Sequence, residues 1–332
     1  MGTPAGGWPH RPLLYLGDPL PALAFVALCL AWGGTWLAIR IGVHETPPLW
    51  LAATRFTVAG LLLLGVARFA GGWRRISLPD LGRLVVMSAG AISICFGLIF
   101  WGEQYVESGL AGVLVQGFVP IGLFAFAMLL GKERVAGRQL VGLLLGLAGV
   151  ALLILTQIRY ESDARVLAGT VAIIVGTLIY DWAGVYGGNL LSRYPAPLMS
   201  AYENLIGGVL LLPVSLVLEG HRLASDGLVP NVRALGSWLY LVVIGSMVGF
   251  TAYTYLLAKW GPTRTSAYAF VTPVVAVTVG VFFAGEHLRW QDLLGAGMVV
   301  IAVVFIVTRR RPATDAAPVV QDAVEPEQVR HS

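Results

Sequence analysis

Three ionisable side chains, Arg55, Asp181 and Glu203, lie inside long apolar segments of the sequence. An ionisable group within a membrane span is costly, so we expect it to pair with an opposite charge, face water or contact a ligand. Arg55 and Glu203 are opposite in sign and could form a structural salt bridge, latch a gate or hold the two ends of a zwitterion. Asp181 and Glu203 are the candidates for carrying protons. The three residues predict a polar site within a membrane protein.

Aromatic residues accompany these charges in a regular pattern. Trp32 and Trp36 are four residues apart, as are Trp182 and Tyr186, so each pair shares one helical face. Tryptophan in membrane chains commonly forms belts at the lipid surface, but these pairs fall in the middle or later half of their segments. Two interpretations stay open: belt or packing residues, or the lining of a cavity. Further hydroxyl and amide groups for the same wall come from Tyr105, Tyr202, Asn204, Tyr253 and Tyr255.

The elements that must position these side chains are apolar helices. Hydrophobic residues make up 57% of the 332 residues and charged residues only 12%, against about 25% charged residues in a soluble domain. A bilayer core of about 30 Å needs apolar helices of about 20 residues. We therefore predict an all-α integral membrane protein with ten transmembrane helices, the first a retained span and not a cleaved signal peptide. The expected spans are roughly 20–41, 49–68, 84–103, 108–130, 138–156, 166–187, 196–218, 235–258, 264–284 and 291–308.

An internal repeat organises these spans into two halves. Pro120 and Glu133 recur as Pro273 and Glu286, 153 residues later in both cases, and Leu140 and Gly142 recur as Leu293 and Gly295 at the same offset. We predict a first five-helix repeat at 20–156 and a second at 166–308, with a cytoplasmic segment 1–19 before them and a disordered tail 309–332 after them. Because five spans is an odd number, the halves are expected to be inverted, as in many transporters.

The repeat also relates the candidate site residues. Trp32 and Trp36 match Trp182 and Tyr186 at an offset of 150 residues, and Arg55 matches Glu203 at 148. The second span of each half should therefore carry an ionisable group at the same depth. Lysine and arginine gather in the segments that lie inside when the N-terminus is inside, which predicts that both termini are cytoplasmic.

The repeated motif has structural and functional interpretations. Pro120 and Pro273 lie well inside the bilayer, where a proline bends or breaks a helix and forms either a fixed kink or a moving hinge. Glu133 and Glu286 precede the fifth and tenth spans, where a carboxylate can cap a helix, with contact to substrate or protons as the alternative. Gly142 and Gly295 favour close helix packing.

Several other functions have little support in the sequence. All five histidines lie outside the spans, so a histidine base or zinc site within the membrane is not available. Cys29 and Cys95 lie inside apolar segments and are expected to be structural. No Walker pattern is present, because Glu133 follows Lys132 where Ser or Thr would be needed. We expect no catalytic residues, no metal and no cofactor. The net charge of +4 gathers at span ends, so nucleic acid is not an expected partner.

These motifs resemble those of the drug/metabolite transporter superfamily, in its ten-helix branch of EamA-type permeases. The resemblance covers residues 20–308 and rests on Trp32-Gly33-Gly34, on Arg55-Phe56, on the block from Pro120 to Gly142, and on Gly261-Pro262-Thr263-Arg264 with the motif that follows. Lys132 departs from the family pattern by interrupting the Gly-Glu turn in the first copy. The resemblance implies a permease of the cytoplasmic membrane that works as a single chain or a homodimer and exports or exchanges amino acids, other metabolites or drugs.

The sequence therefore predicts a secondary transporter that moves a small-molecule substrate, preferably an amino acid or a related compound, by alternating access. A non-transporting membrane sensor or assembly protein is the alternative, followed by an intramembrane enzyme.

Overall fold

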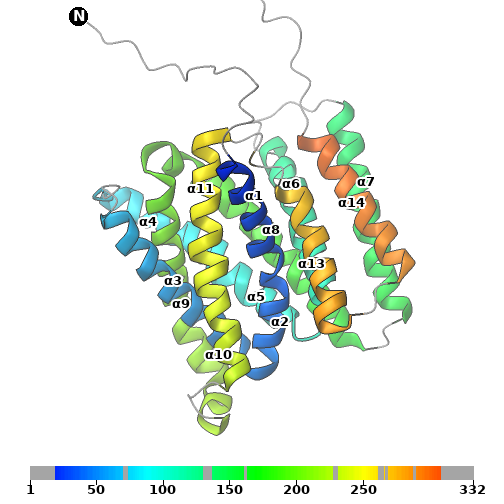
Figure 1. Cartoon of the computed structure of the whole chain (residues 1–332), viewed down its shortest axis with the longest axis horizontal. Coiled ribbons are helices and arrows are strands. Elements are labelled where there is room, and N and C mark those ends of the chain that lie inside the picture. The colour runs from blue at the N-terminus through cyan, green and yellow to red at the C-terminus, as the bar shows by residue number, and fades with distance from the viewer. Residues whose placement is uncertain are drawn as a thin grey trace, which may run out of the picture.

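The computed structural model describes residues 19–69, 74–129, 137–160, 163–226, 231–260, 265, 268–286 and 289–307. Within these ranges the secondary structure is helical and contains no strand. The helices form a bundle in which the start of α1 and the end of α14 lie at the same end (Figure 1). Glu133 and most of the two terminal segments fall outside the described residues.

The helices of the first half run from α1 to α7. Their bounds are α1 Leu20–Gly33, α2 Thr35–Glu45, α3 Pro48–Phe69, α4 Leu78–Ser88, the π-helix η1 Ala89–Ile94, α5 Cys95–Gly102, α6 Ser108–Leu129 and α7 Gly137–Tyr160. Those of the second half are α8 Ala164–Arg193, α9 Ala196–Asp226, α10 Val232–Leu239, the π-helix η2 Tyr240–Val248, α11 Gly249–Trp260, α13 Tyr268–Ala284 and α14 Trp290–Val307.

Six helical stretches are long and apolar enough to cross a membrane, and the all-α prediction is confirmed. They are Leu20–Glu45, Pro48–Phe69, Leu78–Gly102, Ala164–Gly187, Pro197–Ser225 and Val232–Tyr253. Shorter apolar helices cover Ser108–Val119, Leu140–Leu153, Val271–Ala284 and Trp290–Ala302. The chain is thus a multi-pass helical membrane protein.

Several helices extend beyond the apolar segments that predict them. The third span begins at Leu78 and not near residue 84, because the side chain of Ser77 accepts a hydrogen bond from the amide of Asp80 and caps α4. Asn231 caps α10 in the same way through the amide of Ala234. Polar turns at helix ends are helical for this reason, although their composition places them outside an apolar window.

Corresponding spans of the two halves are interrupted in the same way. The span that contains α4 and α5 passes through the π-helix η1, and the span that contains α10 and α11 passes through η2. A π-helical segment widens the turn and is frequent at functional sites. By contrast, Pro120 and Pro273 lie within the continuous helices α6 and α13.

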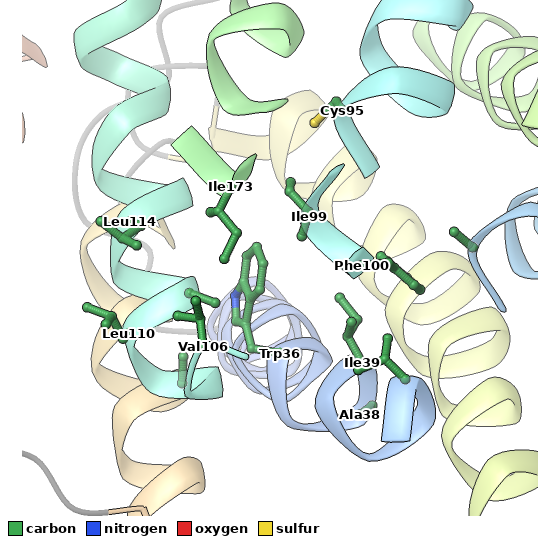
Figure 2. Packing of buried hydrophobic residues seen from close by; sticks show 14 of the residues in the cluster. Trp36, Ala38, Ile39, Cys95, Ile99, Phe100, Val106, Leu110, Leu114 and Ile173 are labelled. Atoms are coloured by element: carbon green, nitrogen blue, oxygen red, sulfur yellow. The ribbon is translucent and has the colours of Figure 1, made fainter. Parts of the chain in front are cut away.

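Close contacts between glycines and neighbouring helices hold the bundle together. Gly149 of α7 lies against the carbonyl of Gly295 of α14, which brings these two helices into backbone contact. The main apolar cluster lies beside them in the centre of the bundle, where the Trp36 indole stands among Ile99, Val106 and Ile173 (Figure 2). Several members of this cluster, including Trp36, Ile39 and Ile99, also line the cavity described below.

Candidate functional site

A cavity of about 310 Å³ lies between helices of both halves. Its volume falls at the lower end of the range for small-molecule sites, roughly 300–1,000 Å³. The polar side chains that line it are Thr35, Arg55, Gln116, Thr177, Tyr180, Ser200, Glu203, Asn204, Ser246, Tyr253 and Tyr268. Most of the remaining wall is aromatic or aliphatic, so the cavity combines these eleven polar side chains with an apolar surface.

Arg55 of α3 is the cationic group of this cavity. Its side chain is buried, and its guanidinium carbon lies 4.3 Å from the ring centroid of Phe56 and 5.8 Å from those of Phe96 and Phe100. Aromatic faces attract a cation in this way and hold its position. Among the described residues, Nε and Nη1 of Arg55 have no hydrogen-bond partner. The guanidinium is therefore positioned by aromatic rings and not by hydrogen bonds at these two nitrogens.

Glu203 of α9 is the anionic group of the same cavity. Ser200, about one helical turn before it, and Asn204, the next residue, also line the cavity. The Asn204 amide donates to the Ser200 carbonyl at 2.8 Å, which leaves its side-chain oxygen available as an acceptor. Within the described part of the chain, no ion pair links Glu203 to Arg55. The structural salt bridge considered from the sequence is thus not formed in this conformation.

The register of α3 and α9 shows how the two charges are placed. Gly60 packs on the backbone of Leu205, and Gly208 packs on the backbone of Thr57, so the helices run antiparallel. Residue 62 then lies level with Glu203, and Arg55 is seven residues, about 10 Å, further along the axis. The prediction of equal depth is wrong, because antiparallel helices carry matched positions to opposite sides of their crossing point.

Trp32, Trp36 and Tyr253, three of the predicted aromatic residues, line the cavity. The Trp32 indole nitrogen donates to the Gly245 carbonyl of η2 at 3.0 Å, and its ring lies 5.4 Å from that of Tyr253. Tyr268 meets both rings edge to face. The indole nitrogen of Trp36 is buried without a partner among the described residues. Trp32 and Trp36 of the first half thus line the cavity together with Tyr253 and Tyr268 of the second half.

Other predicted site residues lie away from the cavity. Trp182 and Tyr186 stack on each other at 5.4 Å on an outer face, with 41% and 42% of their surface exposed. Tyr105 packs against Trp101 in the turn before α6. Tyr202 packs beside the small apolar cluster around Leu84, and Tyr255 borders a separate shallow surface pocket next to Leu20.

Asp181 of α8 also lies outside the cavity wall, although its neighbour Tyr180 is part of that wall. The Asp181 residue is 0% exposed, and neither carboxyl oxygen has a hydrogen-bond partner among the described residues. Its carboxyl group rests on Gly122 of α6. The structure thus separates Asp181 from the pair Arg55 and Glu203.

Glu286 caps a helix, but not the one that follows it. Its carboxylate accepts from the amide and hydroxyl of Ser108, at 2.7 and 2.6 Å, and from the amide of Gly109 at 2.9 Å. These donors belong to the first turn of α6, in the other half of the chain. Glu219, which the sequence reasoning missed, caps α3 across the halves through the amides of Leu49 and Trp50, at 3.0 and 2.9 Å.

Glu103 forms a buried acidic centre at the same end of α6, directly after the span Leu78–Gly102. It is 0% exposed, and both carboxyl oxygens lack hydrogen-bond partners among the described residues. Arg40 donates instead to the backbone carbonyls of Glu103, at 3.0 Å, and of Val106. Burial raises the pKa of the Glu103 carboxyl well above its usual 4.5, with the nearby charges of Arg40, Glu286 and Arg55 as smaller influences.

Sequence reasoning missed several polar residues of the cavity, including Gln116, Thr177, Ser200 and Ser246. A signal for Gln116 was present, because it is an amide within an otherwise apolar segment. The Ser and Thr residues gave no such signal, because their hydroxyls can bond to their own helix, as Thr177 does to the Ile173 carbonyl at 2.8 Å. Among the described residues, no group of three or more metal-ligating side chains is gathered.

The fold and the site together define a multi-pass helical membrane protein with a partly polar cavity between its helices. The EamA-like transporter family matches the chain twice, at residues 20–155 and 167–308. The chain belongs to this family and is a membrane transporter.

Named relatives agree with this assignment. The chain is 34% identical over 313 residues to the "Uncharacterized inner membrane transporter YedA" of Escherichia coli (strain K12), covering 90% of this chain and 95% of the relative. It is 29% identical over 289 residues to the "Probable terminal-alkyne amino-acid exporter" of Streptantibioticus cattleyicolor, covering 86% and 93%. A solved structure with 20% identity has a TM-score of 0.57, covering 86% of this chain and 97% of that chain, and supports the fold alone.

Proposed function

We propose that this transporter moves a small zwitterionic metabolite, preferably an amino acid or a related compound, across the cytoplasmic membrane by export or exchange. The observation that carries the proposal is a cavity with Arg55 and Glu203 in its wall and no ion pair between them. A substrate carboxylate would receive charge-assisted hydrogen bonds from Arg55, and a substrate ammonium group would be attracted to Glu203. Trp32, Tyr253 and Phe250 would contact the apolar part of the substrate.

The proposed mechanism is alternating access between two inverted five-helix halves with both termini in the cytoplasm. The antiparallel packing of α3 on α9, which hold matched positions of the two halves, supports inversion. The matched π-helices η1 and η2 both contribute cavity residues, Ile92 and Ser246 among them. Each half therefore has a π-helical segment at the cavity, and such segments are frequent at functional sites.

Transport in sealed proteoliposomes tests this function. Purified protein is reconstituted, and uptake of labelled amino acids is measured against an excess of unlabelled substrate inside, so that exchange is detected without a driving gradient. We expect saturable exchange for a subset of zwitterions and none for the matching amines or carboxylic acids. Equal flux of all three chemical classes would contradict the role of paired charges. Absence of any flux from folded, inserted protein would favour the sensor or assembly alternative.

A further inference from the structure

The buried carboxyl group of Asp181 takes no part in the substrate binding that we propose for the cavity. It is fully buried, both of its oxygens are unpartnered among the described residues, and it does not line the cavity. Burying an ionised carboxylate without a partner costs several kcal/mol even after the protein relaxes. Stability therefore does not explain why an acid stands at this position, because the acid has this energetic cost and no hydrogen bond to a described residue.

Packing alone does not require a carboxyl group at this position. The match of Trp32 with Trp182 in the internal repeat places Asp181 opposite Ala31. Ala31 is also buried, with 2% of its surface exposed. One half of the chain thus packs this position with a methyl group, while the other half places an acid there.

The contact of Asp181 with α6 makes the packing of two cavity helices sensitive to its charge. Its carboxyl group lies where a side chain on Gly122 would be, so glycine is what allows this approach. On the cavity side, α6 provides Val115, Gln116 and Val119, and α8 provides Thr177 and Tyr180. A change at the contact between α6 and α8 would therefore reach the cavity wall directly.

Few other titratable groups face this contact. Neither α6 nor η1 contains an ionisable residue, and α5 contributes only the thiol of Cys95. Further titratable groups at the cavity are Tyr180 on α8, Glu203 on α9 and Tyr268 on α13. The ionisable residues of α4, such as Asp80, which pairs with Arg193, and those of α7, such as Arg138, lie near helix ends. No described cation is hydrogen-bonded or ion-paired to Asp181.

We propose that Asp181 is a proton-binding site that couples substrate transport to proton movement. The neutral acid fits the sealed contact between α6 and α8, whereas the carboxylate needs water and is stable only when that contact opens. On opening, the O–H bond of the acid breaks and the proton passes to water. The carboxylate takes a proton from water on the opposite side of the membrane before the contact closes again, so that one proton crosses the membrane in each cycle. This proposal rests on the proposed transport function.

The test uses full-length protein in proteoliposomes that contain a trapped pH-sensitive dye. Wild type, Asp181→Asn, Asp181→Ala and the control Asp292→Asn, another buried acid at the start of α14, are compared. Two quantities are measured for each: exchange of labelled substrate without a gradient, and accumulation driven by a gradient of one pH unit. One proton per substrate sustains about tenfold accumulation under that gradient.

We expect Asp181→Asn and Asp181→Ala to keep exchange within about twofold of wild type. The exchange of one substrate molecule for another across the membrane needs no net proton movement. Both should lose the accumulation of about tenfold and the substrate-dependent dye signal, while Asp292→Asn keeps them. Gradient-driven accumulation by Asp181→Asn equal to wild type would overturn the proposal. Loss of exchange in both folded variants would also overturn it and assign a structural role. Wild type without any exchange would instead refute the transport function.

Discussion

The two halves of the chain keep the same scaffold but use matched residues differently. In the first half, a break at Gly34 between α1 and α2 accompanies Trp32 and Trp36, which line the cavity. In the second half, α8 runs unbroken, and the matching pair Trp182 and Tyr186 stacks on an exposed face. The π-helices η1 and η2 are shared by both halves. Duplication thus preserved the packing of the spans, and the site arose from positions where the copies diverged.

Divergence is clearest for charge, because the second span of one half provides Arg55 and that of the other provides Glu203. We expect Arg55→Gln to lower exchange by about 30-fold or more, since a charge-assisted hydrogen bond contributes roughly 1.5–3 kcal/mol and the cation is also lost. Arg55→Lys should recover only part of the flux, because an ammonium lacks the planar fork that sits over Phe56. Initial exchange rates at equal reconstituted protein measure both. Wild-type flux in Arg55→Gln would remove Arg55 from the site.

The halves also stabilise each other through carboxylate caps. Glu286 and Glu219 of the second half cap α6 and α3 of the first. Removing each carboxylate should lower the free energy of unfolding by about 1–3 kcal/mol, because a cap and its buried donors are lost together. Thermal unfolding of Glu286→Ala and Glu219→Ala in detergent measures this loss. An unchanged melting temperature in either variant would show that its helix end is satisfied in another way.

The contact between Gly122 and Asp181 has no charged counterpart at Ala31, and it can be tested by a double-mutant cycle. Gly122→Ala should destabilise the wild type by about 1–3 kcal/mol, because the added methyl group meets the Asp181 carboxyl. In the Asp181→Ala background the same substitution should cost much less, so the two changes are not additive. Chemical unfolding of the four proteins measures the coupling. Additive effects would mean that the residues do not touch.

Glu103 provides a pH-dependent property of the first half. Because burial raises the pKa of its carboxyl in the folded protein, the folded state retains a proton that the unfolded state releases above about pH 4.5. The stability that depends on this proton is full below pH 4.5 and is lost as the pH rises through the raised folded value. Glu103→Gln should remove this loss of stability. The melting temperature of the variant should therefore rise relative to that of wild type as the pH increases. Parallel pH profiles of the two proteins would contradict this origin.

Composition and repetition were sufficient to predict the helical membrane fold, because span length and patterning depend on lipid thickness. The family was indicated by the resemblance of motifs. The cavity was harder to predict. Arg55 and Glu203 were identified because charge in an apolar segment is costly, but their offset along the helices depends on how α3 and α9 pack at Gly60 and Gly208. The helix that Glu286 caps could not be predicted either, because the donors Ser108 and Gly109 lie 178 and 177 residues away in the sequence.

Substitutions at Trp182 and Tyr186 are expected to have the smallest effect on exchange. Together with Trp32→Leu, they compare matched positions of the two halves directly. Trp182→Leu and Tyr186→Leu should leave exchange within about twofold of wild type, because exposed aromatic residues on the outer face contribute to lipid contact and not to the cavity. Trp32→Leu, at the matched position, should lower exchange by about tenfold, since it loses ring contacts with Tyr253 and Tyr268 and the bond to Gly245. Exchange rates and folded yields of the three variants are compared. If Trp182→Leu lowers exchange as much as Trp32→Leu, both halves present this face to the substrate during transport, and the contrast between the cavity-lining pair Trp32 and Trp36 and the exposed pair Trp182 and Tyr186 fails.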